Sequence, residues 1–409
     1  MDAQSIILHL LTPEGRADPY PLYELAHDLG PVAPAGDGLV LVCGYEAARQ
    51  ALRDPGLGAD SGLTSWGGDA DSRPSLAMLS RSLLVANEPG HGRLRASMAQ
   101  AFTARRVAAL ETGIGRIADA LLDGLEEAGG SPVDFMDAFA FPLPAHVICD
   151  LMGVPAADRA RFRAWAADLS AMLEPLPDPA GLDTADRVAA EVGRYFTGLV
   201  AARRAEPRED LVTAMVAARD QGLLRDDEEL VANLAILLVA GFETTTHLLG
   251  NGLRLLLDHP GAMAALRDGT VPVQGFVDEV LRYDTPVQLS NRVALTDHVS
   301  VGGVPVPAGT HVVVLLGAAN RDPAHYAEPG RFDPTRRDSR PLSFGGGAHY
   351  CLGALLARLE ATVAFGRLPA RFPALTSAPG AEPVRRDRIF LRGHEVLPVI
   401  PNGSGTPGN

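Results

Sequence analysis

The sequence contains no lysine, so all 36 of its positively charged residues are arginine. Aspartate and glutamate outnumber them at 50, which gives a formal net charge of −14. Proteins that bind nucleic acid present a basic surface to the phosphate backbone. The charge balance therefore argues against nucleic acid as a partner.

Cysteine is also scarce, with Cys43, Cys149 and Cys351 the three in the chain. None of them forms a C-x-x-C pair, and three cysteines make a poor disulfide framework. This usage fits a reducing compartment best, and we expect the protein to be cytoplasmic.

No apolar run reaches the length of about 20 residues that a membrane helix needs. The longest strongly apolar stretch, Leu230 to Phe242, is interrupted by Asn233 and followed by Glu243. The shorter stretch Ile6 to Leu11 has no basic flank and does not look like a signal peptide. We expect a protein with no membrane anchor.

Helical periodicity dominates what is present. The longest helix is predicted from Asp226 to Asp258, where Asp226 and Glu229 suggest a capping box and His259-Pro260 ends the pattern. Gly241 and the threonines Thr244 to Thr246 are expected to interrupt it midway. A second helix is predicted from Pro272 to Tyr283.

Strands are predicted to be few and short. The best candidates are Leu39 to Val42 and the segment Val293 to Leu316, which contains a Gly302-Gly303 hairpin signal. Gly56 to Ser75 is predicted to be a long loop, and 402–409 a flexible tail. The expected fold class is mainly α with small β-sheets, in a single domain over 1–409.

A glycine-rich stretch, Phe344 to Gly353, contains Cys351 just before a helical pattern begins. The free N–H groups and the dipole of a helix N-terminus favour a thiolate at Cys351, and a thiolate is a metal ligand and a nucleophile. A small buried structural cysteine is the alternative from these residues alone.

Four separated stretches resemble the cytochrome P450 superfamily of haem-thiolate monooxygenases. Phe344 to Gly353 fits F-G-x-G-x-H-x-C-x-G, and Ala240 to Thr244 fits A-G-x-[D/E]-T. Glu279 to Arg282 fits E-x-x-R, and His91 to Arg95 fits the H-x-x-x-R of bacterial members without a membrane anchor. The E-x-x-R pair alone means little, whereas all four in order are specific. The resemblance covers about residues 17–398, the expected ordered core, and implies a helical prism around haem b with a long central helix.

By this resemblance, Cys351 is the ligand of the haem iron and Phe344 packs beside it. Cationic groups hold the haem propionates, although Pro341 stands where the family often has a histidine, and Arg340 is the suggested replacement. The implied cofactor-binding residues are His91, Arg95, Ala240, Arg292, Phe344, Gly345, His349, Cys351 and Gly353.

The resemblance also implies that Glu243 and Thr244 lie over the distal face of the haem and relay protons. An intrahelical bond to a carbonyl is the alternative for Thr244. A metal pair of Glu243 with His247 lacks an evident third ligand. Glu279 and Arg282 are implied to form a buried network with Arg336 on the proximal side, although a solvated surface pair is the usual meaning of such spacing.

The implied substrate is a bulky hydrophobic natural product of polyketide, macrolide or peptide type. Its contacts are expected from a lid at Gly56–Leu84, from the segment Leu169–Leu182, and from eight further residues. These are Ala235, Val239, Val287, Gln288, Leu289, Ser290, Ile389 and Phe390. Gln288, Ser290 and Asn291 are expected to hydrogen-bond oxygenated groups.

The reaction implied is hydroxylation or epoxidation with O2, in a monomer that receives electrons from a ferredoxin and ferredoxin reductase, or from a flavodoxin. A basic patch for that partner is suggested at Arg93, Arg105, Arg106 and Arg358, with ordinary solvated arginines as the alternative. Oxidative coupling, desaturation and rearrangement are rival reactions. A non-catalytic recruitment module is a further rival, and the presence of Glu243 and Thr244 argues against it.

Overall fold

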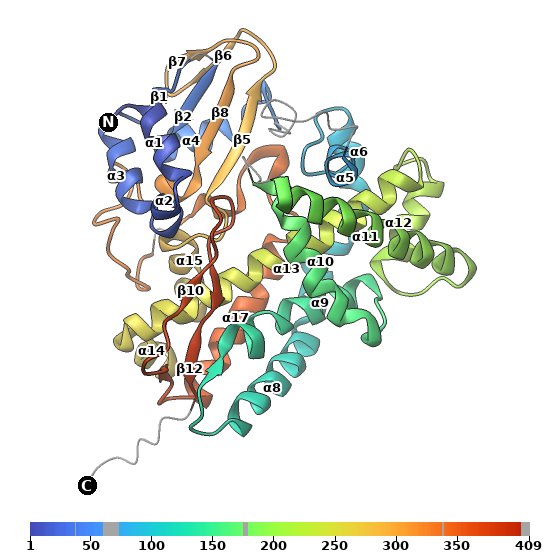
Figure 1. Ribbon diagram of the computed structural model, residues 1–409, viewed down its shortest axis with the longest axis vertical. Coiled ribbons are helices and arrows are strands. Elements are labelled where there is room, and N and C mark those ends of the chain that lie inside the picture. Colours follow the sequence, from blue (N-terminus) through green and yellow to red (C-terminus); the bar gives the residue numbers. More distant parts are fainter. Residues whose placement is uncertain (37, 60–72, 175–178, 338, 402–409) are drawn as a thin grey trace.

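Helices form most of the computed structural model, which describes residues 1–36, 38–59, 73–174, 179–337 and 339–401. The predicted fold class, mainly α with small sheets, is confirmed (Figure 1). The helices are α1 (Ala3–Leu10), α2 (Pro13–Ala17), α3 (Tyr20–Asp28), α4 (Tyr45–Ala51), α5 (Pro74–Ser80), α6 (Gly90–Ala99), α7 (Ala104–Ala109), α8 (Glu111–Glu127), α9 (Pro142–Met152), α10 (Arg159–Leu169), α11 (Pro179–Ala205), α12 (Leu211–Asp220), α13 (Asp227–Asp258), α14 (Pro260–Arg267), α15 (Val273–Tyr283), α16 (Leu316–Ala319) and α17 (Ala354–Arg371).

The strands are short and form four sheets in the described part of the chain. They are β1 (Val32–Pro34), β2 (Leu39–Val42), β3 (Leu57–Ala59), β4 (Val133–Asp134), β5 (Leu289–Ala294), β6 (Val299–Val301), β7 (Val304–Val306), β8 (His311–Leu315), β9 (Thr376–Ser377), β10 (Val384–Arg385), β11 (His394–Val396) and β12 (Pro398–Ile400).

The largest sheet joins three strands near the N-terminus to two strands from the later segment Leu289–Leu315. Its order is β1-β2-β8-β5-β3, with β2 and β8 parallel and the other pairs antiparallel. It lies beside the N-terminal helices α1 to α4 (Figure 1). Valines from β2 and β8 pack in one buried cluster, which fixes the register of the sheet. The sheet thereby holds β5 and β8 in place, and both strands contribute to the cavity described below.

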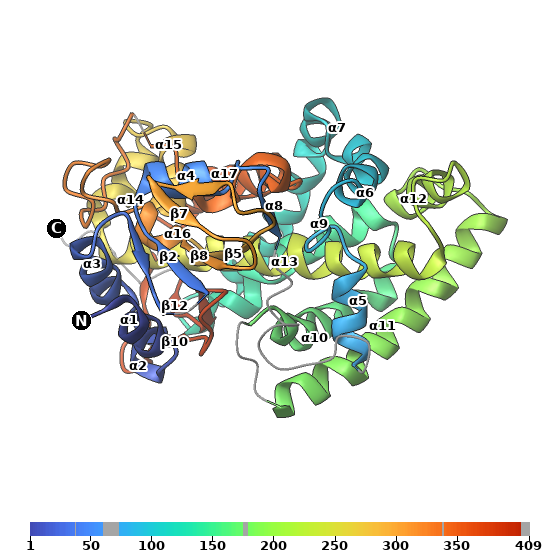
Figure 2. The ribbon, with the colours of Figure 1, turned by 90° about the horizontal axis from the view of Figure 1, so that it is seen from above.

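Helix α13 crosses the body of the molecule (Figure 2). Asp226 caps it by accepting a hydrogen bond from the N–H of Glu229, as predicted. The helix is long and apolar enough to span a membrane, but 78% of its most apolar window is buried inside the fold. It is therefore a core helix around which the other helices pack.

The predicted interruption of this helix is wrong, because α13 runs unbroken from Asp227 to Asp258. The Thr244 hydroxyl donates a 2.9 Å hydrogen bond to the carbonyl of Ala240 without breaking the helix. Gly241 serves close packing, since a Cβ there would lie 3.1 Å from Cδ1 of Ile148 on α9.

Two other expectations change in detail. The predicted loop Gly56–Ser75 contains the edge strand β3 at its start and the first turn of α5 at its end, while 60–72 lie outside the described residues. The predicted flexible tail, 402–409, also lies outside them. The predicted strand Leu39–Val42 is β2, and Gly302 and Gly303, both at positive φ, form the turn between β6 and β7.

Candidate active site

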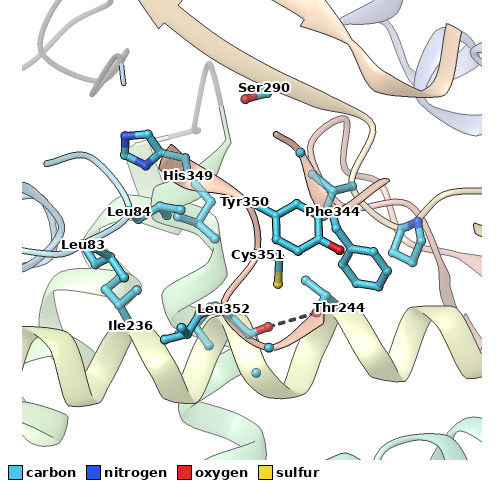
Figure 3. A pocket seen from close by; sticks show the side chains of 18 of the residues that line it. Leu83, Leu84, Ile236, Thr244, Ser290, Phe344, His349, Tyr350, Cys351 and Leu352 are labelled. Carbon is cyan, nitrogen blue, oxygen red and sulfur yellow. Dashed lines mark hydrogen bonds between the residues drawn. The ribbon is translucent and has the colours of Figure 1, made fainter. Parts of the chain in front are cut away.

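A cavity of about 360 Å³ lies between α13 and the glycine-rich loop that precedes α17. Figure 3 shows Cys351 on one side of it and Thr244, on α13, on the other. Further walls come from α5, α6, β5, β8 and the turn at Phe390 and Leu391. The loop, the central helix and the sheet, which are far apart in sequence, thus meet at one space.

Cys351 is the cysteine that lines this cavity, whereas Cys43 and Cys149 are buried elsewhere. The side chain is exposed toward the cavity but enclosed by protein. Burial raises the pKa of the Cys351 thiol above its ordinary value, although the N–H of Gly353 favours the thiolate. Deprotonation of the thiol therefore needs a further driving force. Metal ligation supplies that driving force when it displaces the proton.

The loop that carries Cys351 owes its path to glycine. Gly345 and Gly347 have φ values of +70° and +64°, where a side chain is strained. A Cβ on Gly347 would also lie 2.9 Å from Cα of Arg53. The N–H of Cys351 donates to the carbonyl of Phe344 at 2.9 Å and closes the loop.

Four groups that carry or accept positive charge gather along the cavity: His91, Arg95, Arg292 and His349. Burial lowers the pKa of Arg292 to about 10, and its guanidinium donates to Ser290 and to the carbonyl of Asn291 instead of to a carboxylate. Burial, followed by Arg292, lowers the pKa of His349 to about 3. Nε2 of His91 is buried and has no hydrogen-bond partner among the residues that the structure describes.

Burying such cationic and unpaired groups together costs free energy unless an anion binds to them. A planar cofactor that carries two carboxylates and a metal ion fits these residues. The carboxylates would meet the cationic groups and the metal would be ligated by Cys351, since all of them line one continuous cavity. The residues present therefore fit a haem.

Of the two residues predicted to relay protons, Thr244 lines the cavity and Glu243 does not. The Thr244 hydroxyl bonds to the carbonyl of Ala240, which was the alternative weighed from sequence. Glu243 is 1% exposed and directed away from the cavity, toward Arg386 and Ser170. Successive residues of a helix point about 100° apart, and this turn takes the Glu243 side chain to the side of α13 that faces Arg386.

Three predicted substrate contacts are also wrong, since they do not line the cavity. Ala235 is fully buried in the helical core. Gln288 is buried, where it accepts from the Tyr23 hydroxyl at 2.8 Å and donates to the carbonyl of Thr285 at 2.7 Å. Ile389 lines a separate cavity of about 30 Å³ beneath β5 and β8. The predicted substrate contacts found in the main cavity are Val239, Val287, Leu289, Ser290 and Phe390. Ala240, Phe344, Gly345 and Gly353, predicted to bind the cofactor, also line it, together with the cysteine and the cationic residues described above.

Glu279 and Arg282 form a fully buried ion pair, with contacts of 2.7 and 2.8 Å. Arg282 also donates to the carbonyls of Asn320, Pro329 and Arg331. Nε of Arg336 lies 3.4 Å from Glu279. The pair is not a solvated surface contact, and it pins the coil that leads to the cysteine loop onto α15.

Sequence reasoning did not single out several polar residues that line the cavity, among them Glu174, Asn233, His311 and Glu360. Glu174 lies within the predicted segment Leu169–Leu182, but no pattern singled it out. Glu360 had a signal that was overlooked, because it interrupts the apolar face of α17. Arg340, the suggested propionate contact, is exposed and outside the cavity.

The suggested basic patch is smaller than predicted. Arg93 pairs with the buried Glu229 at 2.7 Å, and Arg358 pairs with Asp278. Arg105 and Arg106 are exposed on α7, and among the described residues neither forms an ion pair. Two of the four arginines therefore have structural partners.

A cysteine facing a long central helix across a cavity with a cationic rim defines a haem-thiolate protein. The Cytochrome P450 family model matches residues 183–270 and 272–391. The chain belongs to the cytochrome P450 family.

Curated relatives span nearly the whole chain. It is 42% identical over 368 residues to cytochrome P450 107B1 of Saccharopolyspora erythraea, covering 88% of this chain and 89% of the relative. It is 37% identical over 399 residues to 6-deoxyerythronolide B hydroxylase of the same organism, covering 94% and 96%.

Among solved structures, P450BioI in complex with an acyl carrier protein ligated to hexadec-9Z-enoic acid has a TM-score of 0.88 and 32% identity. The match covers 95% of this chain and 100% of that one. The protein is thus a cytochrome P450 monooxygenase, an enzyme that works with a cysteine-ligated haem.

Proposed function

We propose that the enzyme hydroxylates or epoxidises a bulky hydrophobic natural product of polyketide, macrolide or peptide type. The observation that carries this proposal is the cavity wall beside α13, which is mainly aliphatic at Leu79, Leu83, Val85, Ile236 and Leu237. Such a wall favours a large apolar molecule with few charges. The relative named 6-deoxyerythronolide B hydroxylase supports a macrolide-like substrate.

Cys351 is proposed as the iron ligand, with Phe344 limiting the access of water to the sulfur. His91, Arg95, Arg292 and His349 are proposed to hold the two propionates, for which their charge and unpaired atoms are suited. The haem supplies the activation of O2 when it is bound. The protein positions the substrate and excludes bulk water.

Thr244 is proposed to hold water at the cavity surface of α13 and to pass protons inward. Its hydroxyl donates to Ala240, so its lone pairs remain available to accept from a water molecule. Glu243, one residue earlier, is proposed as the reservoir of those protons. Because it faces away from the cavity, it acts through water or through a change of side-chain position.

Electrons are proposed to come from a ferredoxin and its reductase, or from a flavodoxin. Arg105 and Arg106, exposed on α7, are the cations proposed to dock an acidic partner. We further propose that the chain works as a soluble, cytoplasmic monomer and that 1–409 form one domain.

Two measurements test this function. Candidate hydrophobic metabolites are titrated into the ferric protein while the Soret band is followed, and a macrolide or polyketide is expected to shift it toward the high-spin position. The product is then formed under 18O2. Incorporation of one labelled atom supports monooxygenation, whereas an oxidised product without label identifies coupling, desaturation or rearrangement. Preference for small acids over large apolar molecules contradicts the proposed substrate class.

A further inference from the structure

The acid Glu243 has its counter-ion on a turn that also touches the substrate cavity. Arg386, directly after β10, pairs with one oxygen of Glu243, and Ser170 donates to the same oxygen at 3.3 Å. The second oxygen is buried, and no described residue hydrogen-bonds to it. Three residues beyond Arg386 the turn reaches Ile389, and then Phe390 and Leu391, which line the cavity.

His247, one turn along α13 from Glu243, completes the setting of Arg386. It is fully buried, and its Nε2 lies 3.5 Å from the guanidinium of Arg386. Burial, and then Arg386, lower the pKa of His247 well below its ordinary value, so the ring is neutral. A neutral ring with its proton on Nδ1 accepts a hydrogen bond from Arg386 at Nε2.

Gly393 makes room for this ring. A Cβ on Gly393 would lie 2.7 Å from Cβ of His247 and closer still to the ring. The carbonyl of Gly393 accepts from the N–H of Arg386 at 3.1 Å. Both ends of the 386–393 segment are therefore packed against the same face of α13.

The middle of the turn is held by a carboxylate that itself lines the cavity. Glu174 accepts from the N–H groups of Ile389 and Phe390 at 3.1 and 3.3 Å. The carbonyl of Phe390 accepts from the N–H of Gln288 at 3.0 Å. A molecule that occupies the cavity beside Phe390 thus bears on a short, well-bonded segment whose far end is Arg386.

We propose that Arg386 is a positioning residue for Glu243, and that the turn Arg386–Leu391 links the setting of this carboxylate to occupancy of the cavity. The catalytic meaning of this proposal rests on the proposed role of Glu243 in proton transfer. The structural link between the turn and the carboxylate does not depend on that role. Ligand contact at Phe390 and Leu391 displaces the turn, Arg386 moves with it, and the Glu243 carboxylate changes its environment. The charged and titratable groups that face Glu243 are Arg386, His247 and the more distant Arg388.

The link is tested without turnover. Infrared difference spectra are recorded on the ferric holoenzyme before and after addition of econazole, an azole found bound to a solved relative of 36% identity. Its binding is followed by the Soret shift. Bands lost in Glu243→Gln are assigned to Glu243. The wild-type protein is expected to show an econazole-dependent change in these bands, and Arg386→Gln is expected to show none. Arg385→Gln is the matched control, because Arg385 is the adjacent residue and pairs with Asp284 at 3.4 Å.

A second measurement separates this proposal from the role of Glu243. Peroxide released per NADPH is measured with a ferredoxin system and myristic acid as probe substrate. Arg386→Gln is expected to raise the release several-fold, because a displaced carboxylate delivers protons less well, and Arg386→Lys is expected to restore part of the loss. If Glu243→Gln changes nothing here, the proton role fails and the infrared result still stands. If Glu243 bands ignore bound econazole in the wild type, or if Arg386→Gln matches Arg385→Gln, the positioning proposal is overturned.

Discussion

The hydroxyl of Ser343 donates a hydrogen bond of 2.6 Å to the carbonyl of Leu281. This bond ties the loop of Cys351 to α15, the helix that carries Glu279 and Arg282. Asn320 donates to Ser343 at 2.9 Å and accepts from the N–H of Leu342 at 2.7 Å, which fixes the same loop from a third side. The position of the cysteine therefore depends on a buried polar framework.

Breaking that framework at Glu279 is expected to unfold the cysteine loop. Glu279→Gln leaves Arg282 buried with its charge unpaired, and removing one partner of a buried pair costs about 3–5 kcal/mol. We expect a loss of haem content together with a lower free energy of unfolding, measured by denaturant titration. Glu328→Gln, in an exposed pair with Arg331, is the control and is expected to change neither. A Glu279→Gln protein with full haem content argues against this role.

Replacing Cys351 with His is expected to abolish the red-shifted Soret band of the reduced, CO-treated protein. The reason is that imidazole does not donate electron density to iron as a thiolate does. The visible spectrum of the CO complex is the measurement. Cys149→Ala serves as control, since Cys149 is buried in the helical core and does not line the cavity. Survival of the band in the Cys351 variant excludes this residue as the ligand.

Arg292→Gln is expected to weaken haem retention about tenfold, the effect of losing one charge-assisted bond of about 1.4 kcal/mol. Arg292 is buried, and no acidic residue in the described part of the chain pairs with it, so its charge is available to a propionate. Transfer of haem to apomyoglobin measures the rate of loss. Arg254→Gln, in an exposed pair with Asp258, is the control. Equal rates in both variants indicate that Arg292 does not contact the cofactor.

Thr244→Ala is expected to increase peroxide release per NADPH by roughly tenfold or more while leaving the fold intact. The hydroxyl bonds within its own helix, so its removal leaves no buried partner unpaired outside α13. Product and peroxide are measured together against NADPH consumed. Thr244→Ser keeps the hydroxyl and is expected to stay coupled. Unchanged coupling in Thr244→Ala removes this residue from the proton path.

Stability at acid pH is expected to depend on Glu229. Burial alone raises the pKa of this carboxyl, but the hydrogen bonds from Arg93 and Arg225 outweigh it and lower the pKa from 4.5 to about 2. A lowered pKa means that the ionised form stabilises the folded state above pH 4.5, and this contribution is lost as the pH falls from 4.5 toward 2. The free energy of unfolding of Glu229→Gln is therefore expected to vary less than that of the wild type over this interval. Parallel curves contradict the assignment.

Much of the frame was predictable because it depends on local chemistry. The cap of α13 at Asp226, the strand Leu39–Val42 and the turn at Gly302-Gly303 follow from short-range hydrogen bonding and backbone preference. The sequence could not show which residues on a buried helix face a cavity. Ala235, on the apolar central helix, packs in the core, whereas the neighbouring Ile236 lines the space.

By itself, the sequence determined the family, the cysteine loop, the E-x-x-R pair and the cationic residues near the cofactor, because each depends on residue types at fixed spacing. The tertiary structure alone decided that Glu243 turns from the cavity toward Arg386, a residue 143 positions later in the chain. It also decided that Gln288 is hydrogen-bonded to Tyr23 and that Arg93 is paired with Glu229. Each of these outcomes depends on which polar partner lies within hydrogen-bonding distance of a buried group in the folded chain. Local sequence does not encode that distance.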